Sequence, residues 1–187
     1  RGGDRYSVLI PLLLIGSSMT APQLAMQAAA QTVVDDSPGG MALAVNRMLG
    51  GIVTYATWPN EAPGAPRTMC VTGTPRLTER PAPDLPGRGS VSVRRVSAAA
   101  AIGGAGCHML YLGQMPAVDQ QRLIGWVRGK AVLTVTDDDS NCNLGAMFCL
   151  NAQGQRLSFS VNLDSIGRGT VRVDPRVLKI GSDGGPR

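Results

Sequence analysis

The sequence predicts an α/β protein, a three-layer sandwich around a small and mainly parallel sheet, with a C-terminal β-hairpin and two disulfides. Strand-like and helix-like segments alternate between residues 41 and 136, which is typical of parallel sheets covered by helices on both faces. The run 107–113 is nearly all apolar, as expected of a strand in the middle of such a sheet. The chain has 187 residues, 43% hydrophobic and 17% charged, which indicates one folded domain and excludes a disordered protein.

Residues 1–30 have the pattern of a secretory signal peptide. Arg1 and Arg5 precede an apolar run at 8–15, and small residues follow up to Ala30. The apolar run is much shorter than the roughly 20 residues that a membrane-spanning helix needs. We therefore expect the protein to be exported and the signal to be removed near Ala30.

The mature protein is predicted to be a single domain over 31–187, with an ordered core at about 35–180. Its charge is modestly basic, because the whole chain carries 18 basic and 13 acidic residues. The basic residues are scattered along the chain and form no block, so we expect a solvated surface and no nucleic-acid partner.

An amphipathic helix is predicted at 41–55, because apolar residues recur at steps of three and four. These apolar positions are Met41, Val45, Met48, Ile52 and Tyr55. The helix is expected to end by the segment before Pro59, since proline disfavours helical backbone in the residue that precedes it. A strand follows at 68–73, and the proline-rich stretch 75–89 is expected to be a loop or a single helical turn.

The middle of the chain predicts a crossover unit. A strand at 91–96 is followed by a short helix at 97–102, which has a serine cap and a glycine stop. The apolar strand 107–113 then leads into a helix at 117–128, opened by a proline, and into a strand at 130–136. Strand, helix and strand in this order indicate parallel neighbours in an open sheet.

The C-terminal part of the chain no longer alternates between strand-like and helix-like segments. Two strand-like runs within 149–162 surround a glycine-containing turn and predict a hairpin. The segment 164–169 is expected to be a short turn. A terminal helix is predicted to start at 174–178, with an aspartate cap and a proline in its first turn.

The four cysteines, Cys70, Cys107, Cys142 and Cys149, allow three pairings. Their order alone does not choose among these pairings. The short loop between Cys142 and Cys149 contains a glycine that permits a chain reversal, which favours this pair and leaves Cys70 with Cys107 on two predicted strands. Two disulfides are typical of an oxidising compartment, and the spacing does not suit a structural zinc site.

No catalytic constellation is predicted. The only histidine, His108, lies in an apolar strand, where a core or rim residue is the more common role and a hydrolase using it is disfavoured. The acidic run 137–141 lacks the glycine and glutamate of a calcium loop, and 103–106 does not open a helix as a dinucleotide motif would. We therefore expect no enzyme activity, no cofactor and no metal.

Five segments taken together resemble the YfiR family of exported proteins, in order over about 35–180. The segments are Thr57-Trp58-Pro59, 107–113, 145–150, 157–164 and 172–178. The resemblance implies a periplasmic α/β sandwich with disulfides Cys70–Cys107 and Cys142–Cys149.

The resemblance also implies a function. Members like YfiR repress an inner-membrane, YfiN-like diguanylate cyclase by binding its periplasmic sensor domain, which lowers cyclic di-GMP signalling and biofilm formation. An outer-membrane, YfiB-like lipoprotein relieves this repression. Whether the chain also forms a homodimer is left open.

Carried onto this chain, the resemblance implies two groups of site residues. The partner-binding residues would be Asn162, Leu163, Asp164 and Ile166. A shallow ligand pocket would lie near Arg172, Asp174 and Pro175. The chain departs from the family pattern at Ser160, where members often carry an acid, and at Asp174, where the pattern has a histidine. Core packing is the alternative role for Leu163 and Ile166, and helix capping for Asp174.

A different class of function remains open from the residues alone. A periplasmic small-ligand-binding module would capture its ligand in an apolar pocket, which we expect to be lined by Trp58 or Phe148. Neither this role nor repression of a receptor requires catalytic groups.

Overall fold

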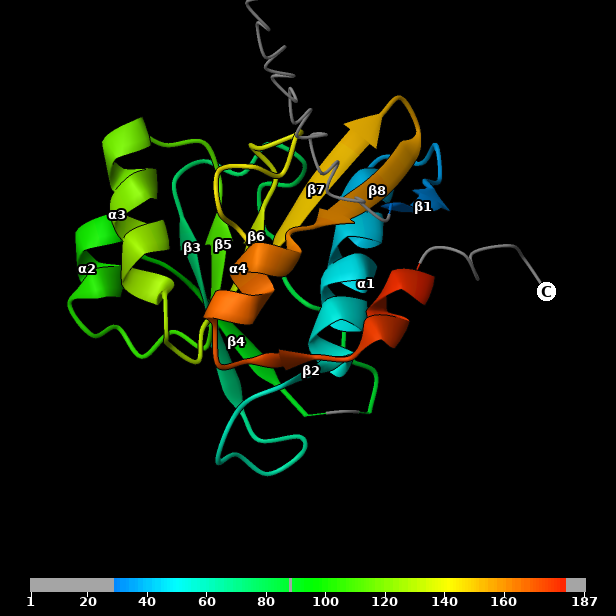
Figure 1. Cartoon of the computed structure of the whole chain (residues 1–187). Helices are drawn as coiled ribbons and strands as arrows, with labels where there is room; N and C mark the ends of the chain where they lie inside the picture. The colour runs from blue at the N-terminus through cyan, green and yellow to red at the C-terminus, as the bar shows by residue number, and fades with distance from the viewer. Residues whose placement is uncertain (1–28, 88, 181–187) are drawn as a thin grey trace, which may run out of the picture.

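The computed structural model describes residues 29–87 and 89–180, which form a seven-stranded sheet flanked by helices (Figure 1). The strand order is β1-β8-β7-β6-β5-β3-β4. The strands are β1 (Ala29–Val33), β3 (Arg67–Thr72), β4 (Val91–Arg95), β5 (Met109–Leu112), β6 (Leu133–Thr136), β7 (Phe148–Gln153) and β8 (Arg156–Val161). The five strands from β4 to β7 are parallel, whereas β8 and β1 are each antiparallel to their neighbours. This confirms the mainly parallel sheet and the C-terminal hairpin.

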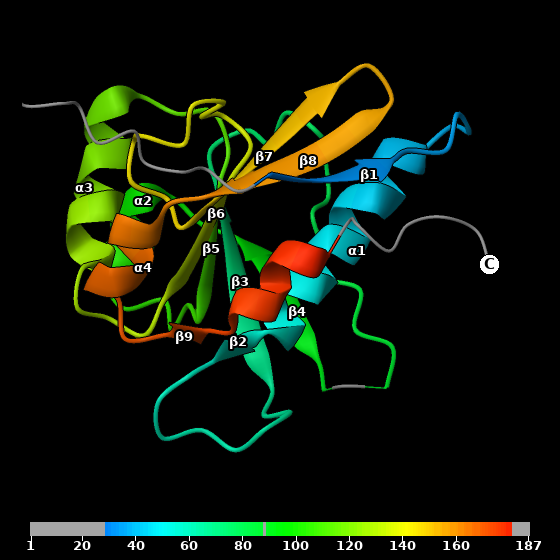
Figure 2. The ribbon, with the colours of Figure 1, turned by 45° about the vertical axis from the view of Figure 1, so that its right-hand side comes forward.

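Helices cover both faces of the sheet, as Figure 2 shows. The helix α1 (Gly40–Thr54) packs on one face, and α2 (Ala98–Ile102) and α3 (Ala117–Val127) pack on the other. The central strand β5 is buried throughout, and its side chains alternate between the two hydrophobic clusters. Tyr111 belongs to the cluster under α1, and Leu110 belongs to the cluster under α3. The three layers predicted from the sequence are therefore present.

The helix α1 follows the predicted apolar pattern but ends slightly earlier. It stops at Thr54, and the next residues form the short strand β2 (Ala56–Thr57), which pairs with β9 (Arg172–Val173). Gly50, on the buried side of α1, packs against the main chain of Asp84, where a Cβ atom would overlap the carbonyl oxygen. The loop after β3 is thus held close to the helix.

The predicted crossover unit is confirmed. The helix α2 starts after Ser97, whose side chain accepts a hydrogen bond from the Ala100 amide, and α3 starts directly after Pro116. The strands β5 and β6 that flank α3 are parallel neighbours, with Met109 paired to Leu133. The described residues between β3 and β4, 73–87 and 89–90, form no regular helix, as expected from the prolines there.

The segment expected to be a turn at 164–169 is instead a short helix, α4 (Leu163–Arg168). Asn162 caps this helix, and one helical turn is completed before Gly169. The predicted terminal helix is a 3-10 helix, η1 (Pro175–Lys179), whose first turn is capped by Asp174.

Residues 1–28 of the predicted signal lie outside the described residues. The predicted cleavage site near Ala30 falls within β1, which pairs with β8 through Ala29 opposite Ser160 and Val33 opposite Arg156. Within the described ranges, no helix combines the length and apolar character needed to cross a membrane.

Both predicted disulfides are present. Cys70 of β3 is joined to Cys107, which directly precedes the turn into β5, and their Cα atoms are 5.6 Å apart. Cys142 is joined to Cys149 of β7, with a Cα separation of 5.4 Å. The first bridge therefore links β3 to the segment that leads into its parallel neighbour β5, and the second closes the loop that enters β7.

Candidate functional site

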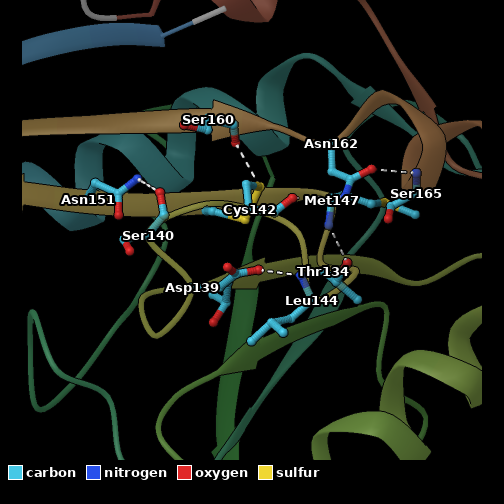
Figure 3. The surroundings of a disulfide bond; sticks show 12 residues. Thr134, Asp139, Ser140, Cys142, Leu144, Met147, Asn151, Ser160, Asn162 and Ser165 are labelled. Carbon is cyan, nitrogen blue, oxygen red and sulfur yellow. Dashed lines mark hydrogen bonds between the residues drawn. A yellow bond between two sulfur atoms is a disulfide. The ribbon is translucent and has the colours of Figure 1, made fainter. Parts of the chain in front are cut away.

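The residues implied as partner-binding lie where β8 runs into α4. Asn162 stands at this junction, and its side-chain oxygen accepts a hydrogen bond of 2.9 Å from the Ser165 amide. Its side-chain nitrogen donates a hydrogen bond of 3.0 Å to the carbonyl oxygen of Cys142. The same side chain therefore caps α4 and ties it to the loop closed by the Cys142–Cys149 disulfide (Figure 3).

The disulfide loop is itself fixed to the sheet. The amide of Leu144 donates to the Asp139 carboxylate at 2.7 Å, and the amide of Met147 donates to the Thr134 hydroxyl at 2.9 Å (Figure 3). Gly145 has φ of 110°, and a side chain there would collide with Ile124 of α3. The loop is consequently held by β6 beneath it and by α3 beside it.

A cavity of about 150 Å³ lies between α3, the disulfide loop and α4. Asn162, Asp164, Ser165 and Arg168 line it from the side of α4, together with residues of α3 and the loop. Two exposed apolar side chains belong to the elements that line this cavity. Leu144, in its wall, is 52% exposed, and Leu163, the first residue of α4, is 70% exposed.

The charged residues of α4 form an ion pair. The Arg168 guanidinium lies 2.7 Å from the Asp164 carboxylate, one helical turn away. The hydrogen bond from Arg168 lowers the pKa of Asp164 below its ordinary value, with a smaller contribution from Arg128. The same pair raises the pKa of Arg168. Both groups are therefore charged at neutral pH and remain accessible to a partner.

The four implied residues do not share one environment. Leu163 points its apolar side chain into solvent, whereas Ile166 is half-buried and packs against the core cluster under α1. Packing is therefore part of the role of Ile166. Asn162 anchors the helix, and Asp164 presents a charge at its first turn.

The residues implied as a ligand pocket follow in the chain. Arg172 lies in β9, opposite Thr57 of β2. Asp174 caps η1 by accepting a hydrogen bond from the Arg176 amide, and its carboxylate lies 2.6 Å from the Arg176 guanidinium. The hydrogen bonds from Arg176 lower the pKa of Asp174 to about 2. Pro175 opens η1. Asp174 thus has the capping role, and a pocket at this place stays a prediction.

Trp58 and Phe148, expected at the wall of an apolar pocket, lie in the hydrophobic core and are 1% and 0% exposed. The Arg67 guanidinium lies over the Trp58 ring, 4.3 Å from its centroid, and lines a cavity of about 400 Å³ with residues of α1. The two aromatic rings therefore stabilise the core, and an apolar ligand would have to bind elsewhere.

His108 connects several parts of the fold through its two ring nitrogens and its carbonyl oxygen. Its Nδ1 atom accepts a hydrogen bond from the Thr68 amide at 3.0 Å, and its Nε2 atom lies 3.4 Å from Glu61. Its carbonyl oxygen accepts the indole hydrogen of Trp58 at 3.1 Å. Both ring nitrogens are thus engaged in joining β3, β5 and the loop that carries Glu61. Sequence reasoning missed Glu61 because an isolated acid in a proline-rich loop gives no local signal.

One comparison with known proteins bears on identity. A protein-family model described as YfiR/HmsC-like matches residues 44–182, which is most of the chain and includes both disulfides and α4. The matched region begins within α1 and extends past η1. The chain therefore belongs to the YfiR/HmsC-like family.

Proposed function

We propose that this protein is a periplasmic regulator that binds the periplasmic sensor domain of an inner-membrane diguanylate cyclase and holds the cyclase inactive. Membership in the YfiR/HmsC-like family supports a periplasmic regulatory role in YfiN-type signalling. The two disulfides suit an oxidising compartment. Repression would lower cyclic di-GMP and biofilm formation, and a YfiB-like outer-membrane lipoprotein would relieve it.

The observation that carries the proposal is the exposure of Leu163 on an anchored helix. We define the α4 surface as Leu144, Asn162, Leu163, Asp164 and Arg168. Single exposed leucines are common on protein surfaces. Here two exposed leucines, Leu144 and Leu163, lie on the disulfide loop and on α4, the elements that also carry the cavity wall and the Asp164–Arg168 ion pair. Little ordering entropy would be lost when a partner docks on such a preorganised surface.

The proposed mechanism requires no chemistry in this chain. A protein that binds the inactive conformation of a receptor more tightly than the active one shifts the receptor population toward the inactive form. A tenfold difference in affinity corresponds to about 1.4 kcal/mol of coupling free energy. The lipoprotein would restore activity by sequestering this chain or by competing for its surface.

The test is direct binding between the purified mature protein and the purified periplasmic domain of a YfiN-like cyclase from the same organism. The variant Leu163→Ala should weaken binding about tenfold or more, because an apolar anchor at the centre of an interface has an effect of this size. Leu43→Ala is the matched control, since Leu43 is 55% exposed on α1. It should bind like the wild type.

Two results would contradict the proposal. The first is the absence of saturable binding between the two purified proteins. The second is that Leu163→Ala binds the sensor domain as tightly as Leu43→Ala does, which would show that the α4 surface is not part of the interface. In cells, loss of the protein should raise cyclic di-GMP, and Leu163→Ala should raise it more than Leu43→Ala does.

A further inference from the structure

The strand β4 forms one edge of the seven-stranded sheet, because among the described strands it pairs only with β3. The strand is accessible along most of its length. Four of its five residues are exposed, and Val93, in the middle of the strand, is 40% exposed. An exposed edge strand is a template on which another extended chain can pair.

The direction of the main-chain groups of β4 follows from its contacts with β3. The Arg67 amide donates to the Ser90 carbonyl at 3.0 Å, and the Val96 amide donates to the Val71 carbonyl at 3.0 Å. Because successive residues of a strand direct their main-chain groups to opposite sides, the even-numbered residues of β4 bond to β3. The odd-numbered residues therefore direct their amides and carbonyl groups out of the sheet. These residues are Val91, Val93 and Arg95.

A groove of about 320 Å³, which we call the β4 groove, lies beside this edge. Val71 and Val93 line it from the sheet, and Pro81 and Ala82 line it from the loop after β3. This loop is held in place, because the Ala82 amide donates to the side-chain oxygen of Asn46 in α1 at 2.8 Å. The groove therefore offers a fixed apolar wall next to the outward main-chain groups of β4.

The charge around the β4 groove is positive. Its charged lining residues are three arginines, Arg80, Arg94 and Arg95, and one acid, Glu79. All four are exposed, and one carboxylate balances only one of the three guanidinium groups. Arg94 and Arg95 are neighbours in a strand, so their side chains project to opposite faces of the sheet. Arginine therefore flanks the edge on both faces.

These charges determine which kind of chain can pair with β4. If a second copy paired through its own β4, the arginines of both strands would gather along one short edge, where like charges repel. An acidic chain instead places carboxylates beside Arg94 and Arg95, where they accept charge-assisted hydrogen bonds. Charge complementarity thus favours an acidic partner over self-association.

We propose that β4 is a docking edge for an extended, acidic segment of a partner protein, which adds a strand to the sheet and places an apolar side chain in the β4 groove. In such strand addition, main-chain hydrogen bonds provide affinity and the side chains that enter a groove provide specificity. On an antiparallel partner strand, acidic residues lie opposite Arg94 and Arg95, and an apolar residue lies opposite Val93. The proposal does not depend on the proposed repressor function, because it uses no residue of the α4 surface.

The test is a titration of the ¹⁵N-labelled mature protein, at low salt, with the blocked peptide Ac-Thr-Glu-Glu-Val-Thr-Val-Thr-NH2, followed by amide chemical shifts. In the antiparallel register the first valine of the peptide faces Val93. Saturable shifts should include the amides of Val93 and Arg95. The peptide in which lysine replaces both glutamates should bind about tenfold more weakly or less, because it meets the arginines with like charge.

Methylated peptides separate strand pairing from charge attraction. A methyl group on the amide nitrogen of the first valine removes its hydrogen bond to the Val93 carbonyl, so binding should fall about tenfold. A methyl group on the amide nitrogen of the next threonine, which points away from β4, should leave binding within about threefold of the parent peptide.

Variants of β4 test the same reasoning from the side of the protein. Arg94→Glu should weaken binding of the acidic peptide about tenfold and strengthen binding of the lysine peptide. Arg122→Glu, the same change of charge at an exposed position of α3, should leave both unchanged. Val93→Pro removes an amide that points out of the sheet, where an edge strand tolerates proline, and should abolish binding. Val93→Thr keeps this amide and the branched side chain, and should bind like the wild type.

Any of four outcomes would overturn the proposal. The first is the absence of saturable shifts with the acidic peptide, and the second is equal binding of the acidic and lysine peptides. The third is equal binding of the two methylated peptides, which would exclude strand pairing. The fourth is self-association that Val93→Pro abolishes while Arg94→Glu leaves peptide binding unchanged, which would assign the edge to a second copy of this chain. The methylated peptides and the charge variants decide the outcome even if Val93→Pro does not fold.

Discussion

Replacing Asn162 by alanine tests whether one side chain holds α4 in place. Asn162→Ala removes the cap on the Ser165 amide and the hydrogen bond to the Cys142 carbonyl. It leaves the backbone hydrogen bond from residue 162 to Met147 intact. The perturbation is therefore limited to the two side-chain bonds that join α4 to its own first turn and to the disulfide loop.

The expected loss can be worked out from these two bonds. Losing a helix cap costs about 1 kcal/mol, within a range of about 0.5–2 kcal/mol. Losing the second hydrogen bond costs about 1 kcal/mol more, because the Cys142 carbonyl is left without this donor. The free energy of unfolding should fall by about 2 kcal/mol, which for a domain of this size lowers Tm by roughly 4–8 °C.

The assay is urea unfolding of the oxidised protein, with Asn162→Ser as the matched control. Serine can cap α4 but is too short to reach Cys142, so this variant should lose about 1 kcal/mol, half of the alanine effect. The reasoning is refuted if the alanine variant unfolds within about 0.5 kcal/mol of the wild type, or if serine and alanine are equally destabilising.

Four further predictions concern other parts of the chain. The double variant Cys142→Ala, Cys149→Ala opens a loop with a separation of seven residues and should lose about 2.5 kcal/mol in urea unfolding; an unchanged midpoint would contradict this. Gly50→Ala should destabilise by about 1–3 kcal/mol, because its Cβ would overlap the main chain of the loop beside α1. Gly125 of α3 has open space where a Cβ would lie, so Gly125→Ala should stabilise the fold by about 0.5–1 kcal/mol. Thermal unfolding in which both glycine variants shift Tm in the same direction would refute the packing argument. Finally, the pKa of Asp174 is lowered to about 2, so its ion pair stabilises the fold above the ordinary aspartate pKa and this contribution disappears as the pH falls from about 4 to about 2. Asp174→Asn should therefore lower Tm at neutral pH, and the two melting curves should converge in acid; a difference that persists in acid would exclude the ion pair as its cause.

The elements that the sequence predicted well have either a pronounced pattern of apolar residues or clear residues that start and stop a helix. The helix α1 was visible because its apolar residues recur over four turns, and β5 because a buried central strand is apolar on both faces. The short helix α2 was visible from its cap and stop residues. Both disulfides followed from spacing and from the family resemblance.

The elements that the sequence did not predict are short or depend on distant partners. The six residues of α4 are too few to show a helical period, although the asparagine before them is a cap signal. The strands β2 and β9 have two residues each and exist because they pair with one another. The environment of Asp137 is set by Tyr111, 26 residues away, so a run of three aspartates was interpreted only as a turn.

The pairing of β1 with β8 has a consequence for how the chain acquires its structure. The first strand, which begins at Ala29, has its neighbour at Ser160, so the sheet cannot be completed until almost the whole chain has been synthesised. Contacts between such distant residues slow folding, because a long stretch of chain must be ordered before they form. A polypeptide of this topology keeps one sheet edge incomplete until the segment around residue 160 is available, so pairing of β1 with β8 is expected to be a late step of folding.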